Sequence, residues 1–311
     1  KSNIYFPEKK ILHYNLIEKL RYGENPHQES AIYSQNKELK IKKIHGKKLS
    51  YNNYNDIFSA LAISKSLPKN KGAVIVKHAN PCGVSIHKNN LESYKLALAC
   101  DPTSAFGGIV SCNFKITKII ATELNKIFLE VVVANGFDRN ALKILKLRKN
   151  LRLIDASNFS FNEVLKLNSI NNSMLTQFED RQIFSKNHFK IVSRKKPSNS
   201  QFENLIFAFN VCRFVKSNAI VLASNKSTVG IGSGQPSRLD SCQIAINKMN
   251  KFTKVKKEIV AASDAFFPFV DGIEKLVQSG VTAVIQPAGS IRDNEIIKFA
   301  NITGTTLIFS K

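Results

Sequence analysis

The stretch that decides the fold is AVIVKHANPCG, residues 73–83. Its first four residues form a short apolar run rich in β-branched side chains, which predicts a buried β-strand over 73–76. The following Asn-Pro-Cys-Gly, residues 80–83, is typical of a turn and is expected to end that strand. Lys77 and His78 therefore lie where the strand meets its loop, the place where α/β sheets usually bind ligands.

Short apolar runs and amphipathic segments alternate outward from this stretch. They predict a helix over 91–100, a strand after the glycines at 107–111, a helix over 116–128, a strand over 131–133, a helix over 141–147 and a strand over 151–154. Beyond two polar connectors, 155–172 and 193–200, they predict helix 201–215, strands 219–222 and 228–231, helix 237–249, strand 283–285, helix 293–300 and strand 306–309. Strands that alternate with helices predict an α/β fold with helices on both faces of the sheet.

Length and composition exclude several classes of protein. The chain has 311 residues, 43% hydrophobic and 22% charged, which is typical of a soluble globular protein of about two domains. We place the boundary in the second connector, with one domain over 1–193 and another over 194–311. No apolar run approaches the roughly 18–20 residues of a membrane helix, and the first residues do not form a signal peptide. A cytoplasmic protein is expected, and the missing initiator Met suggests a piece of a longer chain.

Cysteine content and net charge bear on the compartment and the partners. The five cysteines are widely spaced and include no C-x-x-C pair, which argues against a disulfide framework or a structural zinc and for a reducing compartment. The net charge is +23, from 46 Lys and Arg against 23 Asp and Glu. One interpretation is a nucleic-acid-binding surface. The other, favoured by the scatter of basic residues along the whole chain, is solvated lysine on every face, which still attracts small polyanions.

The two halves share a faint sequence echo. The segment 77–80 is matched by 216–218, each with a lysine shortly before an asparagine. The small-residue and Phe turn at 104–107 is matched by a similar turn at 263–268. The echo is compatible with a duplication without deciding it.

Lys77 and His78 could carry chemistry, because they pair a cation with a proton acceptor that titrates near neutral pH. The alternative is a capped turn with two surface side chains. Zinc deaminase chemistry would need His-x-Glu and Pro-Cys-x-x-Cys. Asn80 stands in place of that Glu, and Cys82 has no second cysteine three residues on, so no catalytic metal is expected.

Three further segments are open to both a functional and a structural interpretation. Residues 230–238, GIGSGQPSR, could hold an anion on backbone N–H groups and the closing arginine, or form a tight strand-to-helix turn. Residues 262–272 place three Phe beside two carboxylates, which suits core packing or a stacked heteroaromatic ligand. Residues 21–28, RYGENPHQ, are a dense polar segment in which Arg21 and Tyr22 would suit a phosphate.

Taken together and in this order, these segments resemble the signatures of the aminoimidazole carboxamide ribonucleotide (AICAR) transformylase family, the formyltransferase domain of bifunctional purine biosynthesis proteins. The matching patterns are Arg-Tyr-Gly-x-Asn-Pro-His-Gln, Lys-His-x-x-Pro-x-Gly, Asp-Pro-Thr-Ser-Ala-Phe-Gly-Gly, Ser-Asn followed by Gly-x-Gly-x-Gly-Gln-x-Ser-Arg, and Ser-Asp-Ala-Phe-Phe-Pro-Phe. The similarity runs from about residue 6 to the end. The family's N-terminal cyclohydrolase domain is not in this sequence, so no IMP cyclohydrolase activity is expected from the chain alone.

The resemblance implies an α/β fold of two cytidine-deaminase-like α/β/α subdomains, duplicated and without zinc. It implies a homodimer with active sites at the subunit interface, natural fusion to an IMP cyclohydrolase domain, and no membrane or nucleic-acid partner. The implied reaction transfers a formyl group from 10-formyltetrahydrofolate to the 5-amino group of AICAR. The products are FAICAR and tetrahydrofolate, in the de novo synthesis of IMP, and no catalytic metal takes part.

The family's functional residues carry over to matching positions of this sequence. His78 is implied as the general base, Lys77 as the cation that stabilises the tetrahedral intermediate, and Asn218 as a hydrogen-bond partner of the amino or formyl group. The implied ribonucleotide-binding residues are Arg21, Tyr22, Phe106, Gly107, Glu130 and Phe266, and the implied folate-binding residues are Arg238, Leu239, Asp271, Ser290 and Ile291. An aromatic amine conjugated to a carboxamide is a poor nucleophile and needs a base, and a fixed cation beside the imidazole favours its neutral form and stabilises the oxyanion.

The sequence departs from the family pattern at a few places. Asn135 stands where Pro is usual, which affects the local turn, and Val270 stands where Arg is common, which removes one folate-side charge. Glu130 stands where Asp also occurs, and the sequence stops at Lys311, short of the usual Arg-containing tail. Two other functions stay open: a ribonucleotide-binding module that has lost catalysis, and, less favoured, a basic nucleic-acid-binding protein. The intact catalytic residues argue against the first.

Overall fold

The computed structural model describes residues 6–161, 165–253 and 257–310. Within these ranges, twelve strands pair into one large mixed sheet. From edge to edge they are β11 (Phe189–Ile191), β16 (Thr306–Ser310), β15 (Ala283–Pro287), β14 (Val260–Ser263), β12 (Ile220–Ser224), β13 (Ser227–Gly232), β5 (Asn80–Ile86), β4 (Gly72–Lys77), β6 (Ile109–Cys112), β7 (Val131–Ala134), β8 (Arg152–Asp155) and β3 (Lys42–His45).

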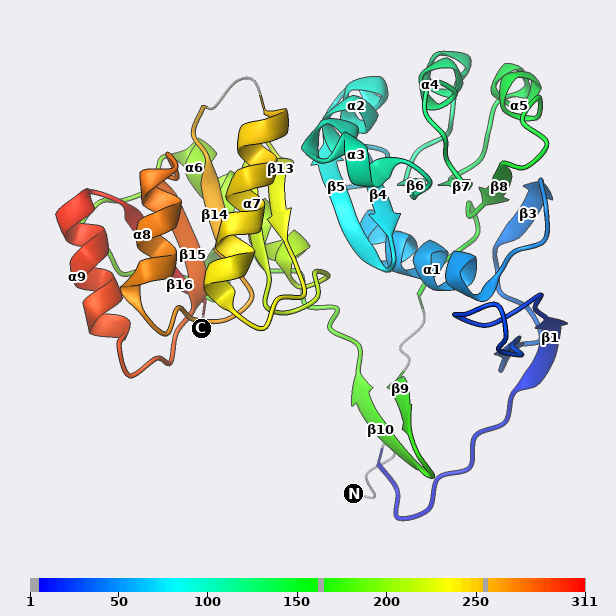
Figure 1. The fold of residues 1–311 in the computed structure, drawn as a ribbon, viewed down its shortest axis with the longest axis horizontal. Coiled ribbons are helices and arrows are strands. Elements are labelled where there is room, and N and C mark those ends of the chain that lie inside the picture. Colours follow the sequence, from blue (N-terminus) through cyan, green and yellow to red (C-terminus); the bar gives the residue numbers. More distant parts are fainter. Residues whose placement is uncertain (1–5, 162–164, 254–256, 311) are drawn as a thin grey trace.

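Helices cover both faces of this sheet, as the alternating pattern predicted. One face carries α1 (Tyr51–Ser66) and α6 (Asn199–Cys212), and the other carries α2 (Asn90–Cys100), α4 (Lys118–Leu124), α5 (Arg139–Leu145), α7 (Arg238–Phe252), α8 (Val270–Gln278) and α9 (Asp293–Thr303). Figure 1 shows α4 and α5 on one side of the first-half strands and α1 on the other. Along β4, Val74 and Val76 pack on the α1 side while Ala73 and Ile75 pack on the α2 side, because successive strand residues point to opposite faces. In the described part of the chain, none of the helices has the length and apolar character needed to cross a membrane.

The same order of strand pairings occurs twice. In the first half, β4 pairs antiparallel with β5 and β6, then β6, β7 and β8 run parallel, and β3 closes the edge antiparallel. In the second half, β12, β13, β14, β15, β16 and β11 repeat that order. The halves join where β5 meets β13, at Ser85 and Ser227, whose hydroxyl oxygens lie 2.7 Å apart. One sheet therefore runs through both halves.

The sequence echo does not mark equivalent positions, so that alignment of the halves was wrong. The segment 77–80 spans the end of β4, whereas 216–218 precedes β12, the strand that takes the place of β4 in the pairing order. Likewise 104–107 precedes β6, whereas 263–268 begins at the last residue of β14. The strand order therefore carries the repetition. The similar motifs lie together on the same side of the sheet, where strands begin or end.

The turn after the first strand is placed differently from the prediction. Residues 80–83 are the start of β5 rather than a turn, and the chain reverses at His78 and Ala79, whose φ angles are +52° and +57°. Two-residue hairpin turns of this left-handed kind match the twist of the paired strands. The helix predicted over 116–128 was also too long, because α4 covers only its middle.

Two small hairpins lie outside the large sheet. β1 (Asn15–Lys19) pairs antiparallel with β2 (Ala31–Ser34), and the loop between them contains residues 21–28. β9 (Leu165–Ile170) pairs with β10 (Ser173–Phe178), and this hairpin extends away from the body of the molecule (Figure 1). Neither was predicted, because strands with few buried residues carry weak hydrophobic periodicity. The predicted connector 155–172 therefore contains β9.

Candidate active site

All the predicted site residues lie along one edge of the large sheet or in a loop held against it. This edge is the one formed by the ends of the strands, not by the outermost strands β11 and β3. β4, β13, β14 and β15 end at this edge, and β6, β7 and β12 begin there, as their pairing directions require. The end of β4 carries Lys77 and His78. The segments before β6, β7 and β12 carry Phe106, Gly107, Glu130 and Asn218, and the segments after β13, β14 and β15 carry Arg238, Leu239, Phe266, Asp271, Ser290 and Ile291.

The first turns of α1 tie the loop at 21–28 and the start of β7 to this edge. Asn52 Nδ2 donates to the carbonyl of Glu24, 3.1 Å away, and Asn53 Nδ2 donates to Glu130 Oε2, 2.8 Å away. Asp56, one turn further on, accepts backbone N–H groups from the turn after β4. Sequence reasoning missed these three residues because it predicted no helix here. The signal was available as Ser50, an N-cap residue followed by closely spaced Asn and Asp.

Lys77 and His78 border an open hollow shared by both halves of the chain. Its lining residues are Lys77, His78, Asn80, Pro81, Cys82 and Ser104 from the first half and Ser233 and Lys248 from the second. Lys77 Nζ donates to the carbonyl of Phe106, 2.8 Å away, which leaves ammonium protons for a ligand. Burial raises the pKa of the Cys82 thiol to about 12, so it is not a thiolate nucleophile at neutral pH. The Lys248 ammonium is paired with Asp101, 2.9 Å away, so the hollow presents the Lys77 ammonium and one exposed imidazole.

The second-half wall of the site is tied to the hollow through hydrogen bonds of the Lys216 backbone. The N–H of Lys216 donates to Asn80 Oδ1, 3.2 Å away, and the N–H of Gly234 donates to the carbonyl of Lys216, 2.7 Å away. The loop before β12 thus contacts both the start of β5 and the loop after β13. These contacts bring the predicted residue Asn218 to the same part of the edge as His78.

Asn218 and Arg238, predicted for different ligands, contact each other directly. Arg238 Nη2 donates to Asn218 Oδ1, 2.6 Å away, and Nη1 donates to Asp264 Oδ1 and to Ser263 Oγ, 2.8 Å away. Asn218 Nδ2 donates to the carbonyls of Gln235 and Pro236 at 2.9 and 2.8 Å. The Arg238 guanidinium is therefore largely buried and paired rather than free in the site.

Asp264 lies at the centre of this network, whereas the sequence singled it out only as one of two carboxylates beside three Phe. Its Oδ1 also accepts the N–H of Ala219, 3.0 Å away, and its Oδ2 accepts the hydroxyl of Ser217. Burial acts to raise the pKa of Asp264, but the hydrogen bonds from Ser217, Arg238 and Ala219 together hold it below its usual value. The carboxylate is therefore ionised at neutral pH and balances the buried guanidinium.

The first two glycines of residues 230–238 serve helix packing. A Cβ at Gly230 would lie 2.2 Å from the carbonyl oxygen of Ala245, and one at Gly232 would lie 1.9 Å from that of Ser241. Both acceptors belong to α7, so the helix backbone rests directly on β13. The structural interpretation of this motif therefore holds for its first two glycines.

Exposed aromatic and apolar side chains line the same edge. Phe106 packs on Phe128 with ring centroids 5.2 Å apart, and both rings are exposed. Phe266 and Ile291 are also exposed, which leaves flat apolar surface beside the polar hollow.

Arg21 lies 5.7 Å from the ring centre of Tyr22, but no ion pair or hydrogen bond between described residues joins its side chain to the rest of the site. In the same described ranges, no three His, Cys, Asp or Glu side chains are grouped closely enough to hold a metal ion.

A family model for the AICARFT/IMPCHase bienzyme matches residues 1–248. The chain belongs to the AICARFT/IMPCHase bienzyme family. It is 43% identical to the bifunctional purine biosynthesis protein PurH of Persephonella marina over 98% of this chain, and 42% identical to those of Leptospira biflexa over 99% and Aquifex aeolicus over 98%. The match covers 60% of each of these relatives, so the chain spans about three-fifths of their length. The family resemblance predicted from the motifs is confirmed.

Asn135, where the AICARFT/IMPCHase family usually has Pro, has a structural role in this chain. Its Oδ1 accepts the Lys65 ammonium at 2.7 Å, and its Nδ2 donates to the carbonyl of Asn113 at 2.7 Å. Its own N–H donates to the carbonyl of Phe114, 3.3 Å away. Proline could make none of these three hydrogen bonds. The departure changes how the turn is held without touching the predicted site.

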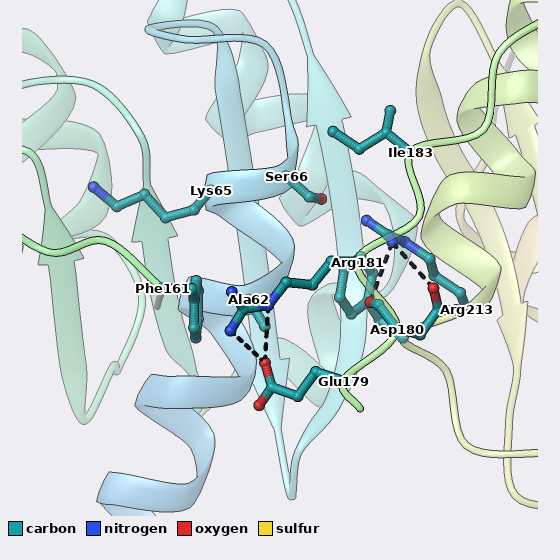
Figure 2. Close-up of a pocket in the computed structure, with 10 residues that line it drawn as sticks. Ala62, Lys65, Ser66, Phe161, Glu179, Asp180, Arg181, Ile183 and Arg213 are labelled. Carbon is teal, nitrogen blue, oxygen red and sulfur yellow. Dashed lines mark hydrogen bonds and ion pairs between the residues drawn. The ribbon is translucent and has the colours of Figure 1, made fainter. Parts of the chain in front are cut away.

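A second hollow lies on the α1 and α6 face and contains none of the residues predicted from the family motifs. Its charged side chains already have partners: Arg181 pairs with Glu179 at 3.0 Å and Arg213 with Asp180 at 3.6 Å (Figure 2). Lys65 donates to two oxygen acceptors of the first half. Because these charges are paired within the protein, the hollow shows no group aimed at a polar ligand.

Proposed function

We propose that this chain transfers a formyl group from 10-formyltetrahydrofolate to the 5-amino group of AICAR, giving FAICAR and tetrahydrofolate in de novo IMP synthesis. One observation carries the proposal: the side chains that the family motifs single out lie along one sheet edge or in a loop held against it, and Lys77 and His78 border a hollow that both halves line. The curated relatives are bifunctional purine biosynthesis proteins, and membership of their family supports the same chemistry here.

In the proposed mechanism the amine nitrogen of AICAR attacks the formyl carbon and forms a new C–N bond. His78 accepts the proton that the amine loses, and the Lys77 ammonium stabilises the oxyanion of the tetrahedral intermediate. The bond between the formyl carbon and N10 of the folate then breaks. The proton held by His78 passes to N10, which leaves as neutral tetrahydrofolate. Atoms and protons balance without a metal ion or an oxidant.

Asn218 would support this step through a free lone pair. Its Oδ1 accepts one hydrogen bond from Arg238, and an amide oxygen can accept a second from the amino group of AICAR. The ribonucleotide would contact the first-half residues of the edge together with Phe266, and the folate would contact the second-half residues. Exposed Phe106 and Phe266 would provide flat surfaces for the imidazole ring.

We also propose that residues 1–193 and 194–311 are duplicated cytidine-deaminase-like α/β/α subdomains, because the order of strand pairings repeats. β11 precedes residue 193 yet pairs with β16, so the pairing of the second half begins slightly earlier than that boundary. A homodimer with its sites at the subunit interface, natural fusion to an IMP cyclohydrolase domain, and a cytoplasmic location remain proposals drawn from the family.

The test is direct: incubate the chain with AICAR and 10-formyltetrahydrofolate and follow the release of tetrahydrofolate. Replacing His78 by Ala should lower kcat by about 10²–10⁴-fold, because a general base usually contributes that much. His87→Ala is the matched control, since His87 follows β5 at the opposite edge and its imidazole hydrogen bonds to the backbone of Asn89. Turnover of the His78 variant within a few-fold of the parent would reject the assignment. AICAR binding by the parent without tetrahydrofolate release would favour the module that has lost catalysis.

A further inference from the structure

We propose that Asp56 of α1 is a positioning residue for His78, because its carboxylate holds the backbone turn from which the imidazole projects. This inference rests on the proposed role of His78 as the base. Asp56 is 9% exposed and faces the turn between β4 and β5. Its carboxylate accepts the backbone N–H groups of His78 and Ala79, so it acts on the reaction through the turn.

Each carboxylate oxygen of Asp56 accepts one N–H of the turn. His78 N lies 3.0 Å from Oδ2, and Ala79 N lies 2.6 Å from Oδ1. Both turn residues are left-handed, a conformation that is unfavourable for residues other than glycine. Turns of this kind favour Asn-Gly or Asp-Gly, and the sequence here is His-Ala. Two charge-assisted hydrogen bonds are the interaction that offsets this cost.

The second half of the sheet contains a neutral version of the same arrangement. The hairpin of β12 and β13 turns at Asn225 and Lys226, both left-handed at φ +49° and +53°. Asn204 of α6 accepts the N–H of Lys226 on its Oδ1, 2.7 Å away. Asp56 and Asn204 are each the sixth residue of their helix and each is largely buried.

The two hairpin turns differ in the side chain that holds them, so they show which contacts a turn requires and which are added at His78. One amide oxygen and one N–H are enough to hold the turn at the edge remote from the site. At the site edge the chain uses a buried carboxylate, although burial raises its pKa and so opposes the charged form. Only a carboxylate offers an acceptor to both N–H groups, since an Asn side chain would turn its own NH₂ toward one of them. Both backbone groups that flank the imidazole are thereby fixed.

Loss of this support would let the turn relax and shift the imidazole. A displacement of about 1 Å at a reacting group can lower the rate about 10²-fold. AICAR binding would change less, because the ribonucleotide-binding residues lie on other segments. A positioning role therefore predicts a fall in kcat with little change in KM.

The experiment compares Asp56→Asn with Asn204→Ala, which removes the corresponding support at the opposite edge. We expect Asp56→Asn to lower kcat about 10- to 100-fold with KM for AICAR within about threefold of the parent. Asn204→Ala should keep kcat within about twofold while lowering the urea midpoint. Adding Ala79→Gly to Asp56→Asn should recover kcat at least about fivefold, because glycine adopts positive φ without strain. Parental kcat in Asp56→Asn, an equal loss in Asn204→Ala, or no recovery with Ala79→Gly would each overturn the proposal.

Amide hydrogen exchange tests whether Asp56 holds the turn, even where the Asp56→Asn variant fails to fold. In the unaltered protein the N–H groups of His78 and Ala79 should exchange slowly, because each is bonded to a buried carboxylate. Rapid exchange of both in a folded sample would overturn the proposal. If the parent itself releases no tetrahydrofolate, the proposed function fails, while slow exchange would still support Asp56 as the group that holds the turn.

Discussion

Replacing Asp264 by alanine should destabilise the protein strongly and in a pH-dependent way. Arg238 Nη1 and Asp264 Oδ1 lie 2.5 Å apart, and their side chains are 9% and 17% exposed. The alanine variant leaves the guanidinium buried without a counter-charge, and breaking such a pair costs about 3–5 kcal/mol. It also removes the acceptor for Ser217 and Ala219.

The expected change in Tm follows from the size of the chain. Unfolding entropy is about 2.1 cal/mol/K per residue, which for 311 residues gives about 0.65 kcal/mol/K. A loss of about 3–5 kcal/mol therefore lowers Tm by about 5–8 °C. Although burial acts to raise it, the pKa of Asp264 is held below its usual value by its hydrogen bonds. Its stabilising contribution is thus complete above the unfolded-state pKa of about 3.9 and is lost as pH falls through the lower folded-state value.

Calorimetric melts of the parent and of Asp264→Ala between pH 3 and 7 test this reasoning. The difference in Tm should stay constant from about pH 7 to about pH 5 and narrow below about pH 4, as the parent loses its own ion pair. Asp240→Ala is the control, because Asp240 is an exposed acid on the same helix as Arg238 and should cost only about 0.3–1 kcal/mol. A Tm of Asp264→Ala within about 2 °C of the parent, or a Tm difference between these two proteins that does not narrow at low pH, would refute the argument.

Two further substitutions test the packing between elements. Gly232→Ala should lower the free energy of unfolding in urea by at least about 1–3 kcal/mol, because the new Cβ would lie 1.9 Å from the carbonyl oxygen of Ser241 and α7 would have to move. A urea midpoint equal to that of the parent would contradict direct contact of α7 with β13. Lys248→Met should lower the free energy of unfolding by about 1–3 kcal/mol. The substitution leaves the Asp101 carboxylate, 3% exposed, without the ammonium now 2.9 Å away. Unchanged thermal and urea stability of that variant would show that this ion pair between the two halves contributes nothing.

Part of the local structure, and the family, were readable from the sequence alone. The apolar runs at 73–76 and 131–133 are strands because β-branched side chains favour a pleated, buried conformation. The family motifs were readable for a similar reason, since a reactive group and its immediate neighbours lie on one short segment. Signals of this kind depend on residues within a few positions of one another.

The tertiary structure alone decided which of these segments meet. Residues 80–83 carry turn chemistry, yet pairing with β4 makes them a strand. The contacts of Asp56 and Asp264 could not be read from the sequence, because their partners lie 22 to 47 positions away along the chain. Strand order and direction bring His78 and Asn218 to one edge, and sheet pairing depends on long-range burial and hydrogen bonding that no short window of sequence contains.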